Sequence, residues 1–294
     1  MKTKPRVCFV LTVTGSSDDY LINGAQILLR SLRISNEKIP VLILYDDLSA
    51  SQLALFGGYE LRKVDLTNYS MSLDSTLNRP DLNSSVFLRF EIQEVVDFDI
   101  AVYLDCDVVV LDNIDEIFGY PGNISAREMA AYPVSSQFAS AEEILQRVNP
   151  EFNSSGQGAL NAGILKFETE FLRAVNLKGQ VLEFLQEYGS DEFNHNDQSL
   201  INLFYCMKPD AFSKLPWEMN FMMYPDMLEG NHEVRLNSHN LYAPFRNGNF
   251  AKVVHWTGPA KPWNLVFRSY TAQERELFCE KCYSQFTGFS KYAV

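Results

Sequence analysis

The segment Ala101-Val102-Tyr103-Leu104-Asp105-Cys106-Asp107-Val108-Val109-Val110-Leu111 decides the fold prediction. Its apolar and aromatic residues predict a buried strand, and two carboxylates, Asp105 and Asp107, stand where that strand ends. Side chains at positions i and i+2 of an extended segment point the same way, so both carboxylates can reach one divalent cation, which would offset the cost of burying them. The alternative is a pair of solvated acids at a strand terminus.

Alternating strands and helices precede this segment. Continuous apolar runs predict strands at Val7–Val13, Val41–Tyr45 and residues 61–66, and apolar residues keep helical spacing between positions 21 and 32. Because β-α-β order implies a parallel sheet covered by helices, we predict an α/β fold with a Rossmann-like, mostly parallel central sheet. Ligands of such sheets bind beyond the carboxyl ends of the strands, so the turn at residues 12–20 is expected to face the same crevice as the carboxylates.

A predicted helix at residues 84–96 carries Arg89 just upstream of the acidic segment. Arg89 has no natural place on the apolar face of this helix. It either reaches the site or pairs with Glu91 or Glu94 at the surface.

The second half of the chain offers further polar candidates. A strand-like run at residues 159–167 contains Asn161, which either donates to a ligand hydroxyl or makes an ordinary turn hydrogen bond. Residues 171–188 have a helical pattern in which Gly179 is a weak point or a break. Asp197 precedes an apolar helix at residues 199–205, where an N-terminal acid is the simplest interpretation.

A second strong signal lies at residues 253–263, where an apolar strand ends in His255 and a Gly/Pro turn presents Lys261 before Trp263. One imidazole can complete an O,O,N metal site with the two carboxylates, and one lysine can neutralise a phosphate. A lone histidine is usually structural, but its combination with Lys261 and Trp263 favours a functional role.

Composition limits the partners of the protein. The chain has 294 residues, of which 46% are hydrophobic, so it can bury a large core. Its formal net charge of −12 disfavours a nucleic-acid partner and leaves an anionic substrate in need of a local cation. Its five cysteines form no obvious disulfide framework, and no apolar run reaches the roughly 18 residues that a membrane-spanning helix needs. We therefore expect a cytoplasmic protein without a transmembrane segment.

Four motifs together resemble a known family. Tyr103-Leu104-Asp105-Cys106-Asp107, Leu160-Asn161-Ala162-Gly163, Asn196-Asp197-Gln198 and His255-x-x-Gly258-x-x-Lys261-Pro262-Trp263 occur in the order and spacing of family 8 retaining glycosyltransferases. Glycogenin and bacterial lipooligosaccharide galactosyltransferases are members. The resemblance runs from Val7 to about Trp263 and implies a GT-A-type fold. We expect this single domain to occupy residues 1–265, with a helical extension at 266–294 packed on it.

The resemblance also implies roles for individual residues. Asp105, Asp107 and His255 would bind Mn²⁺, with Mg²⁺ as an alternative, and the metal would hold the diphosphate of a UDP-sugar donor. Asp197 and Gln198 would be catalytic. The remaining donor contacts implied are the uridine-pocket residues Leu11, Thr12 and Tyr20, the diphosphate residues Gly258 and Lys261, and the sugar-side residues Arg89, Asn161 and Asp105.

The implied reaction is retaining transfer of a hexose, glucose or galactose, to a glycan, glycolipid or protein acceptor. Retention allows either a same-face displacement or a double displacement. Family members often carry an aspartate where this chain reads Ala131-Tyr132-Pro133-Val134, so the donor sugar stays open, as do the acceptor and an oligomeric state.

Two alternatives compete with this function. A phosphatase of the haloacid dehalogenase type also places D-x-D after an apolar strand, but its motif normally continues with threonine where this chain has Val109. The other is a catalytically inactive member of the same fold that only binds a nucleotide sugar.

Overall fold

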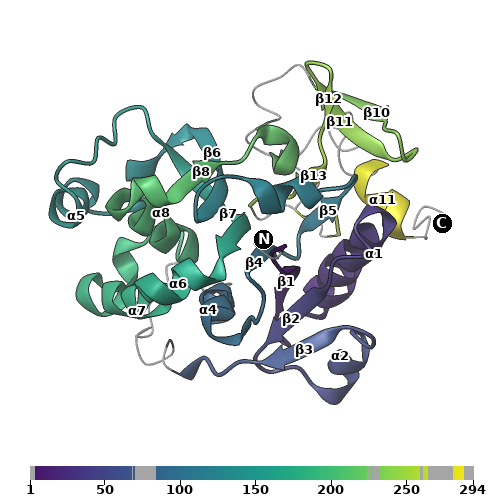
Figure 1. Ribbon diagram of the computed structural model, residues 1–294, viewed down its shortest axis with the longest axis horizontal. Coiled ribbons are helices and arrows are strands. Elements are labelled where there is room, and N and C mark those ends of the chain that lie inside the picture. The colour runs from purple at the N-terminus through teal and green to yellow at the C-terminus, as the bar shows by residue number, and fades with distance from the viewer. Residues whose placement is uncertain are drawn as a thin grey trace.

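A computed structural model describes residues 4–67, 69, 84–223, 226, 232–258, 261–263 and 281–287. A seven-stranded sheet with the order β3-β2-β1-β4-β7-β6-β8 runs through its centre (Figure 1). The strands are β1 (Val7–Val13), β2 (Val41–Tyr45), β3 (Glu60–Lys63), β4 (Ile100–Leu104), β6 (Ile124–Pro133), β7 (Gly158–Glu168) and β8 (Phe212–Lys214).

The sheet is mostly parallel, as the sequence predicts. Strand β1 runs parallel to β2 and β4, and β2 runs parallel to β3. Only β7 among these strands runs against its neighbours, because it pairs antiparallel with both β4 and β6, and β6 runs parallel to β8. The strand predicted at residues 61–66 ends earlier, at Lys63, because its partner β2 ends at Tyr45, the residue paired with Lys63.

Helices cover both faces of the sheet. They are η1 (Tyr20–Ala25), α1 (Gln26–Ser35), α2 (Ala50–Ala54), η2 (Ser84–Glu91), α4 (Ile92–Val95), η3 (Asp115–Gly119), η4 (Val134–Gln137), α5 (Ala141–Val148), α6 (Thr169–Val175), α7 (Leu177–Tyr188), η5 (Ser190–Glu192), α8 (Asp197–Met207), η6 (Pro209–Ala211), η7 (Trp217–Met219) and α11 (Lys281–Thr287). The segment predicted as one helix at 84–96 is a 3₁₀ turn followed by a short α-helix. The helical segment at 171–188 breaks at Asn176, whose positive φ of 49° ends α6, and not at Gly179.

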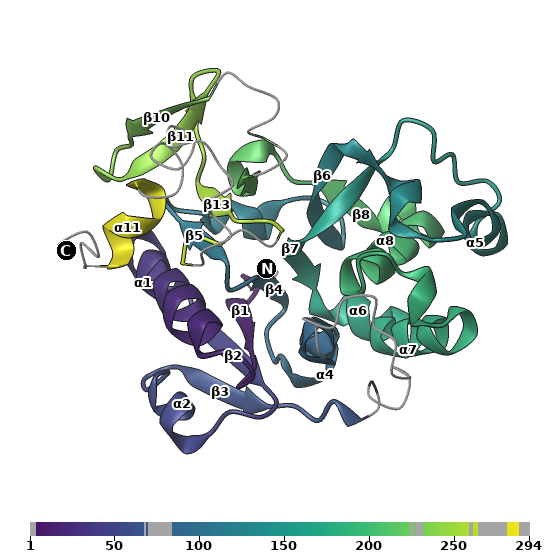
Figure 2. The same cartoon turned by 180° about the vertical axis from the view of Figure 1, so that it is seen from behind.

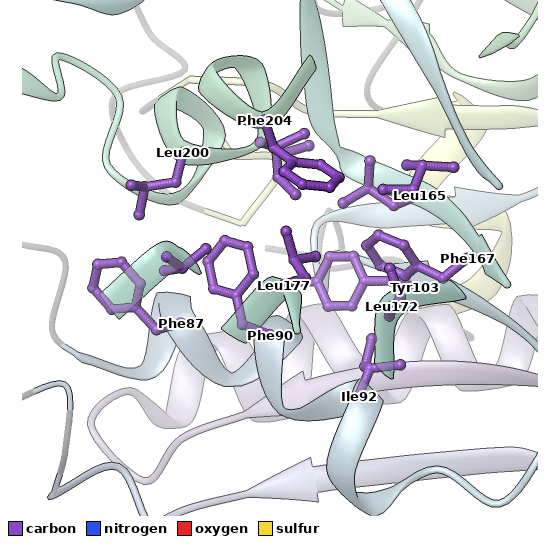
Figure 3. Packing of buried hydrophobic residues seen from close by; sticks show 14 of the residues in the cluster. Phe87, Phe90, Ile92, Tyr103, Leu165, Phe167, Leu172, Leu177, Leu200 and Phe204 are labelled. Carbon is purple, nitrogen blue, oxygen red and sulfur yellow. The ribbon is translucent and has the colours of Figure 1, made fainter. Parts of the chain in front are cut away.

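The alternation of side chains along each strand divides the core into two layers. Ala101 and Tyr103 of β4 face η2, α7 and α8, and Figure 3 shows the rings of Phe87, Phe90 and Tyr103 within this layer. Residues of the opposite parity, such as Val102 and Leu104, pack with α1 on the other side, and Figure 2 shows α1 lying across that face. Burial on both faces explains why β2 and β4 are apolar along their whole length.

The acidic segment does not continue as one strand. Strand β4 ends at Leu104, a turn carries the acids, and β5 (Val108–Val110) joins a second sheet with the order β5-β13-β9, formed with β13 (Val253–His255) and β9 (Phe221–Met222). A third sheet contains β10 (Glu233–Leu236), β11 (Tyr242–Arg246) and β12 (Asn249–Phe250). The turn therefore lies where the central sheet meets a strand from the C-terminal part of the chain.

Helix α11 lies beside α1 (Figure 1). The Tyr283 hydroxyl donates to the carbonyl oxygen of Asn23 at 2.8 Å, and Tyr283 packs in a cluster with Trp256. Of the helical extension expected at residues 266–294, only residues 281–287 belong to the described part of the chain. Among the described helices, none combines the length and apolar character needed to cross a membrane.

Candidate active site

Three predicted metal ligands meet at the junction of the two sheets. Asp105 follows β4, Asp107 precedes β5, and His255 ends β13, which pairs with β5 so that His255 lies opposite Val108. One ligand atom from each of the three residues lies within 4.8 Å of the other two. The Nε2 atom of His255 is 3.3 Å from Asp107 Oδ1 and 3.9 Å from Asp105 Oδ2. The fold thus brings together residues that are far apart in sequence.

The charge balance at Asp107 suits a divalent cation. Burial alone would raise the pKa of this carboxyl, but the Lys261 ammonium, which pairs with Oδ2, lowers it below its ordinary value, so the group is ionised at neutral pH. The other oxygen, Oδ1, is buried and makes no hydrogen bond within the described part of the chain. Two carboxylates and one imidazole are a donor set that Mn²⁺ and Mg²⁺ accept. The residues therefore fit the metal that the sequence predicts.

Gly163 leaves the space in which the ligands meet. A β-bulge interrupts the pairing of β7 with β6 at this point, since Ala126 pairs with Leu165 but the next residue pairs with Asn161. A Cβ atom on Gly163 would lie 2.7 Å from His255 Nε2 and 2.8 Å from Asp105 Oδ2. Only glycine permits this approach, which gives the small polar interruption of the strand a physical reason.

Arg89 lies within the site and not on the surface. Its side chain is buried, and its guanidinium pairs with Asp105 at 3.1 Å and with Asp197 at 2.9 Å. It also donates to the carbonyl oxygen of Ala162 at 2.6 Å. The alternative in which Arg89 pairs with Glu91 is wrong, because Glu91 pairs with a lysine of α7. Arg89 thus joins a predicted metal ligand to a predicted catalytic residue.

Asp197 is both the first residue of α8 and part of the site. The preceding residue, Asn196, adopts a φ of 48°, an uncommon conformation for a residue other than glycine, and this turn delivers the carboxylate to Arg89. Burial raises the pKa of Asp197 to about 6, although Arg89 opposes the shift and Asp105 adds to it. A carboxyl that titrates near neutrality, beside the predicted metal ligands, is typical of a functional group.

The amides of Gln198 and Asn161 are in contact. Asn161 Nδ2 donates to Gln198 Oε1 at 3.3 Å, and Asn161 Oδ1 accepts from the backbone N–H of Gly163 at 3.1 Å. Asn161 lies within β7, beside the bulge, and its bond with the N–H two residues on is the ordinary turn hydrogen bond that the sequence offered as an alternative.

The remaining predicted residues differ in their distance from the metal site and in their exposure to solvent. Thr12 contacts the site indirectly: its Oγ1 lies 3.3 Å from the hydroxyl of Tyr103, which in turn hydrogen-bonds to Asp105. The side chain of Leu11 is fully buried in the core layer beneath α1. Tyr20 is partly exposed and packs edge-to-face on Trp263, with ring centroids 5.4 Å apart. Gly258 has a φ of 80° in the loop that connects His255 to Lys261.

Three residues of the site were missed by sequence reasoning. Tyr103 donates to Asp105 and supports the Arg89 guanidinium, whose central carbon is 4.4 Å from the ring centroid. Its position two residues before Asp105 on a strand is a signal that could have found it. Asn220, which contacts His255 and Asn161, and Gln137, which contacts Gln198, belong to no motif and carry no such signal.

Similar structures share this architecture. The galactosyltransferase LgtC in complex with donor and acceptor sugar analogues superposes with a TM-score of 0.66 at 19% identity, covering 95% of this chain and 93% of that one. An active-site mutant of LgtC gives a TM-score of 0.69 at 18% identity and 95% coverage of both chains. The predicted GT-A-type fold is confirmed by this likeness.

Curated relatives are longer proteins. A probable glycosyl transferase, Gly, from Streptococcus gordonii is 23% identical over 71% of this chain and 26% of its own length. Human glycogenin-2 is 25% identical over 87% of this chain and 44% of its own length. The chain thus spans less than half of either relative. The model of Glycosyl transferase family 8 matches residues 12–266, most of the chain, and the protein therefore belongs to that family, as its motifs predict.

Proposed function

We propose that the protein is a retaining glycosyltransferase that moves a hexose, glucose or galactose, from a UDP-sugar to a glycan, glycolipid or protein acceptor with Mn²⁺. The observation that carries this proposal is the meeting of Asp105, Asp107 and His255 beside Lys261. A bound Mn²⁺ would act as a Lewis acid on the diphosphate leaving group. Family membership supports sugar transfer, whereas the donor, the metal and the stereochemistry are proposals.

The protein's own charges are arranged for a leaving diphosphate on one side and a sugar on the other. Lys261 Nζ, held by Asp107 and by the Trp256 carbonyl oxygen at 2.7 Å, supplies a buried positive charge next to the metal ligands. In the proposed reaction it stabilises negative charge as the bond to the diphosphate breaks. Because Lys261 is already partnered, it needs little reorganisation to do so.

Asp197 and Gln198 lie on the sugar side of this arrangement. The ionised Asp197 stabilises positive charge that develops on the anomeric carbon, and Arg89 orients Asp197 and Asp105 together. Both routes to retention, the same-face displacement and the double displacement with a protein nucleophile, are compatible with this placement.

The decisive experiment measures release of UDP from a panel of UDP-sugars with Mn²⁺ and with a chelator. Metal-dependent turnover of one donor supports the proposal and identifies the sugar. Intact UDP binding without turnover of any donor, in the presence of candidate acceptors, would instead favour the non-catalytic nucleotide-sugar-binding alternative.

A further inference from the structure

A continuous line of hydrogen-bonding side chains connects the metal ligands to the sugar side of the site. It begins at the imidazole of His255 and passes through four side-chain amides, three of which belong to buried residues. The contacts are His255 Nδ1 to Asn220 Oδ1 (3.2 Å), Asn220 Nδ2 to Asn161 Oδ1 (2.9 Å), Asn161 Nδ2 to Gln198 Oε1 (3.3 Å) and Gln198 Nε2 to Gln137 Oε1 (3.2 Å).

Two backbone N–H groups set the direction of this line. The N–H of Gly163 donates to the Asn161 side chain at 3.1 Å, so the atom it meets is the oxygen. The N–H of Ala162 likewise donates to Gln198 at 3.4 Å and identifies the oxygen of that amide. Because an N–H cannot accept a hydrogen bond, neither amide can be turned around without losing its main-chain partner.

The donor-to-acceptor direction of these hydrogen bonds then fixes which ring nitrogen of His255 carries the proton. Asn220 meets the oxygen of Asn161, so Asn220 must present its NH₂ group there and its oxygen to the imidazole. The Nδ1 atom that faces this oxygen must carry a proton. In the neutral ring the lone pair is therefore on Nε2, the atom that lies 3.3 Å from Asp107.

We propose that Asn220 is a positioning residue that sets His255 in the Nδ1–H tautomer, with Nε2 ready to bind the metal, and that orients Asn161 and Gln198 on the sugar side. This inference rests on the proposed function, because it assigns to Asn220 the positioning of both a metal ligand and the residues that would contact the donor sugar. A hydrogen-bonded partner on the far nitrogen is what a metal-binding histidine requires for a fixed ring orientation.

Asn220 is itself held firmly. Its side chain is fully buried, and its carbonyl oxygen accepts a hydrogen bond from Arg127. Arg127 in turn pairs with the buried carboxylate of Asp226, which also accepts from the N–H of Met222 at 2.7 Å. A buried ion pair behind the main chain of Asn220 restricts the movement of its amide.

The tautomer can be observed directly. Long-range ¹H–¹⁵N NMR spectra of the metal-free protein, labelled with ¹⁵N-histidine and recorded where the rings are neutral, distinguish the protonated from the unprotonated ring nitrogen. The chain has four histidines, so His255→Gln assigns the signal. We expect protonation at Nδ1 in the wild type. A predominant Nε2–H form would overturn the inference.

Two substitutions separate the two tasks of Asn220. Asn220→Leu removes the acceptor for His255, and we expect the Mn²⁺ concentration needed for half-maximal UDP binding to rise about 10- to 100-fold. Asn220→Asp keeps that acceptor but cannot donate to Asn161. We expect its Mn²⁺ requirement to stay close to wild type while UDP release from the donor sugar falls about tenfold at saturating metal.

Asn36→Leu is the matched control. Asn36 is also buried and accepts from the N–H of Ile114 at 3.0 Å, but it lies outside this line of contacts. It should lower stability without changing the Mn²⁺ requirement. A wild-type Mn²⁺ requirement in a folded Asn220→Leu would overturn the inference alone, whereas absence of Mn²⁺-dependent UDP binding in the wild type would overturn the proposed function.

Discussion

Replacing Gly163 by alanine tests the metal site with a single methyl group. The added Cβ would overlap the His255 ring and lie 2.7 Å from its Nε2 atom, against an ordinary contact of at least 3.4 Å. The imidazole must therefore retreat by at least about 0.7 Å, because its Cε1 atom lies closer still to the added Cβ, and this is several times the roughly 0.2 Å tolerance of a metal–ligand distance. The ring cannot turn freely, because Asn220 holds its far nitrogen.

This displacement should weaken the metal site far more than the fold. Second-shell changes alone typically cost 10- to 100-fold in metal affinity, so a displaced ligand should cost at least about 100-fold, or about 2.8 kcal/mol. The overlapping atoms belong to the side chains of His255 and Asp105, and the main chain of β7 can stay in place. We expect the variant to fold and to lose Mn²⁺-dependent UDP binding.

Calorimetric titration of UDP at a series of Mn²⁺ concentrations measures this loss, and thermal unfolding in a chelator measures the fold. Gly119→Ala is the control, because a Cβ at Gly119 would meet nothing within 4 Å. If Gly163→Ala bound UDP with the Mn²⁺ dependence of the wild type, the assignment of His255 and Asp105 as ligands of one metal would be refuted.

The other predictions address the charged groups of the site. Asp107→Asn removes a ligand charge and the partner of Lys261. Calorimetry should therefore show no metal-dependent UDP binding at Mn²⁺ concentrations that saturate the wild type. Unchanged UDP affinity would place Asp107 outside the metal site. Because burial raises the pKa of Asp197 to about 6, its carboxyl is charged above that pH and neutral below it, and the turnover number should fall as the pH drops through about 6. Asp197→Asn should bind UDP normally, transfer slowly and lack this acid limb, and a limb that survives in the variant would assign it to another group. Arg89→Met leaves two carboxylates without their shared cation and should lower the unfolding free energy by about 3 kcal/mol in a denaturant titration. A loss below about 1 kcal/mol would show that the pairing is not structural.

Local sequence patterns were sufficient to predict the mostly parallel sheet and to single out the three side chains that meet in the candidate metal site. Strand residues alternate between two apolar layers, so Val7–Val13 and Val41–Tyr45 were predicted with their observed bounds. The carboxylates Asp105 and Asp107 follow such a strand, and His255 ends another. Boundaries were less accurate where irregular structure intervenes, as at residues 84–96, because short 3₁₀ turns depend on packing and leave no clear periodicity.

By itself, then, the sequence determined which side chains were available to bind a metal and a diphosphate. Each of those residues belongs to a short motif that can be recognised within one stretch of the chain. Only the tertiary structure decided how they are held. Arg89 resembles a surface residue until its fold partners Asp105 and Asp197 are known, and Asn220 has no motif at all. The physical reason is that desolvation, ion pairing and hydrogen-bond direction depend on groups from distant segments, and no local pattern encodes those contacts.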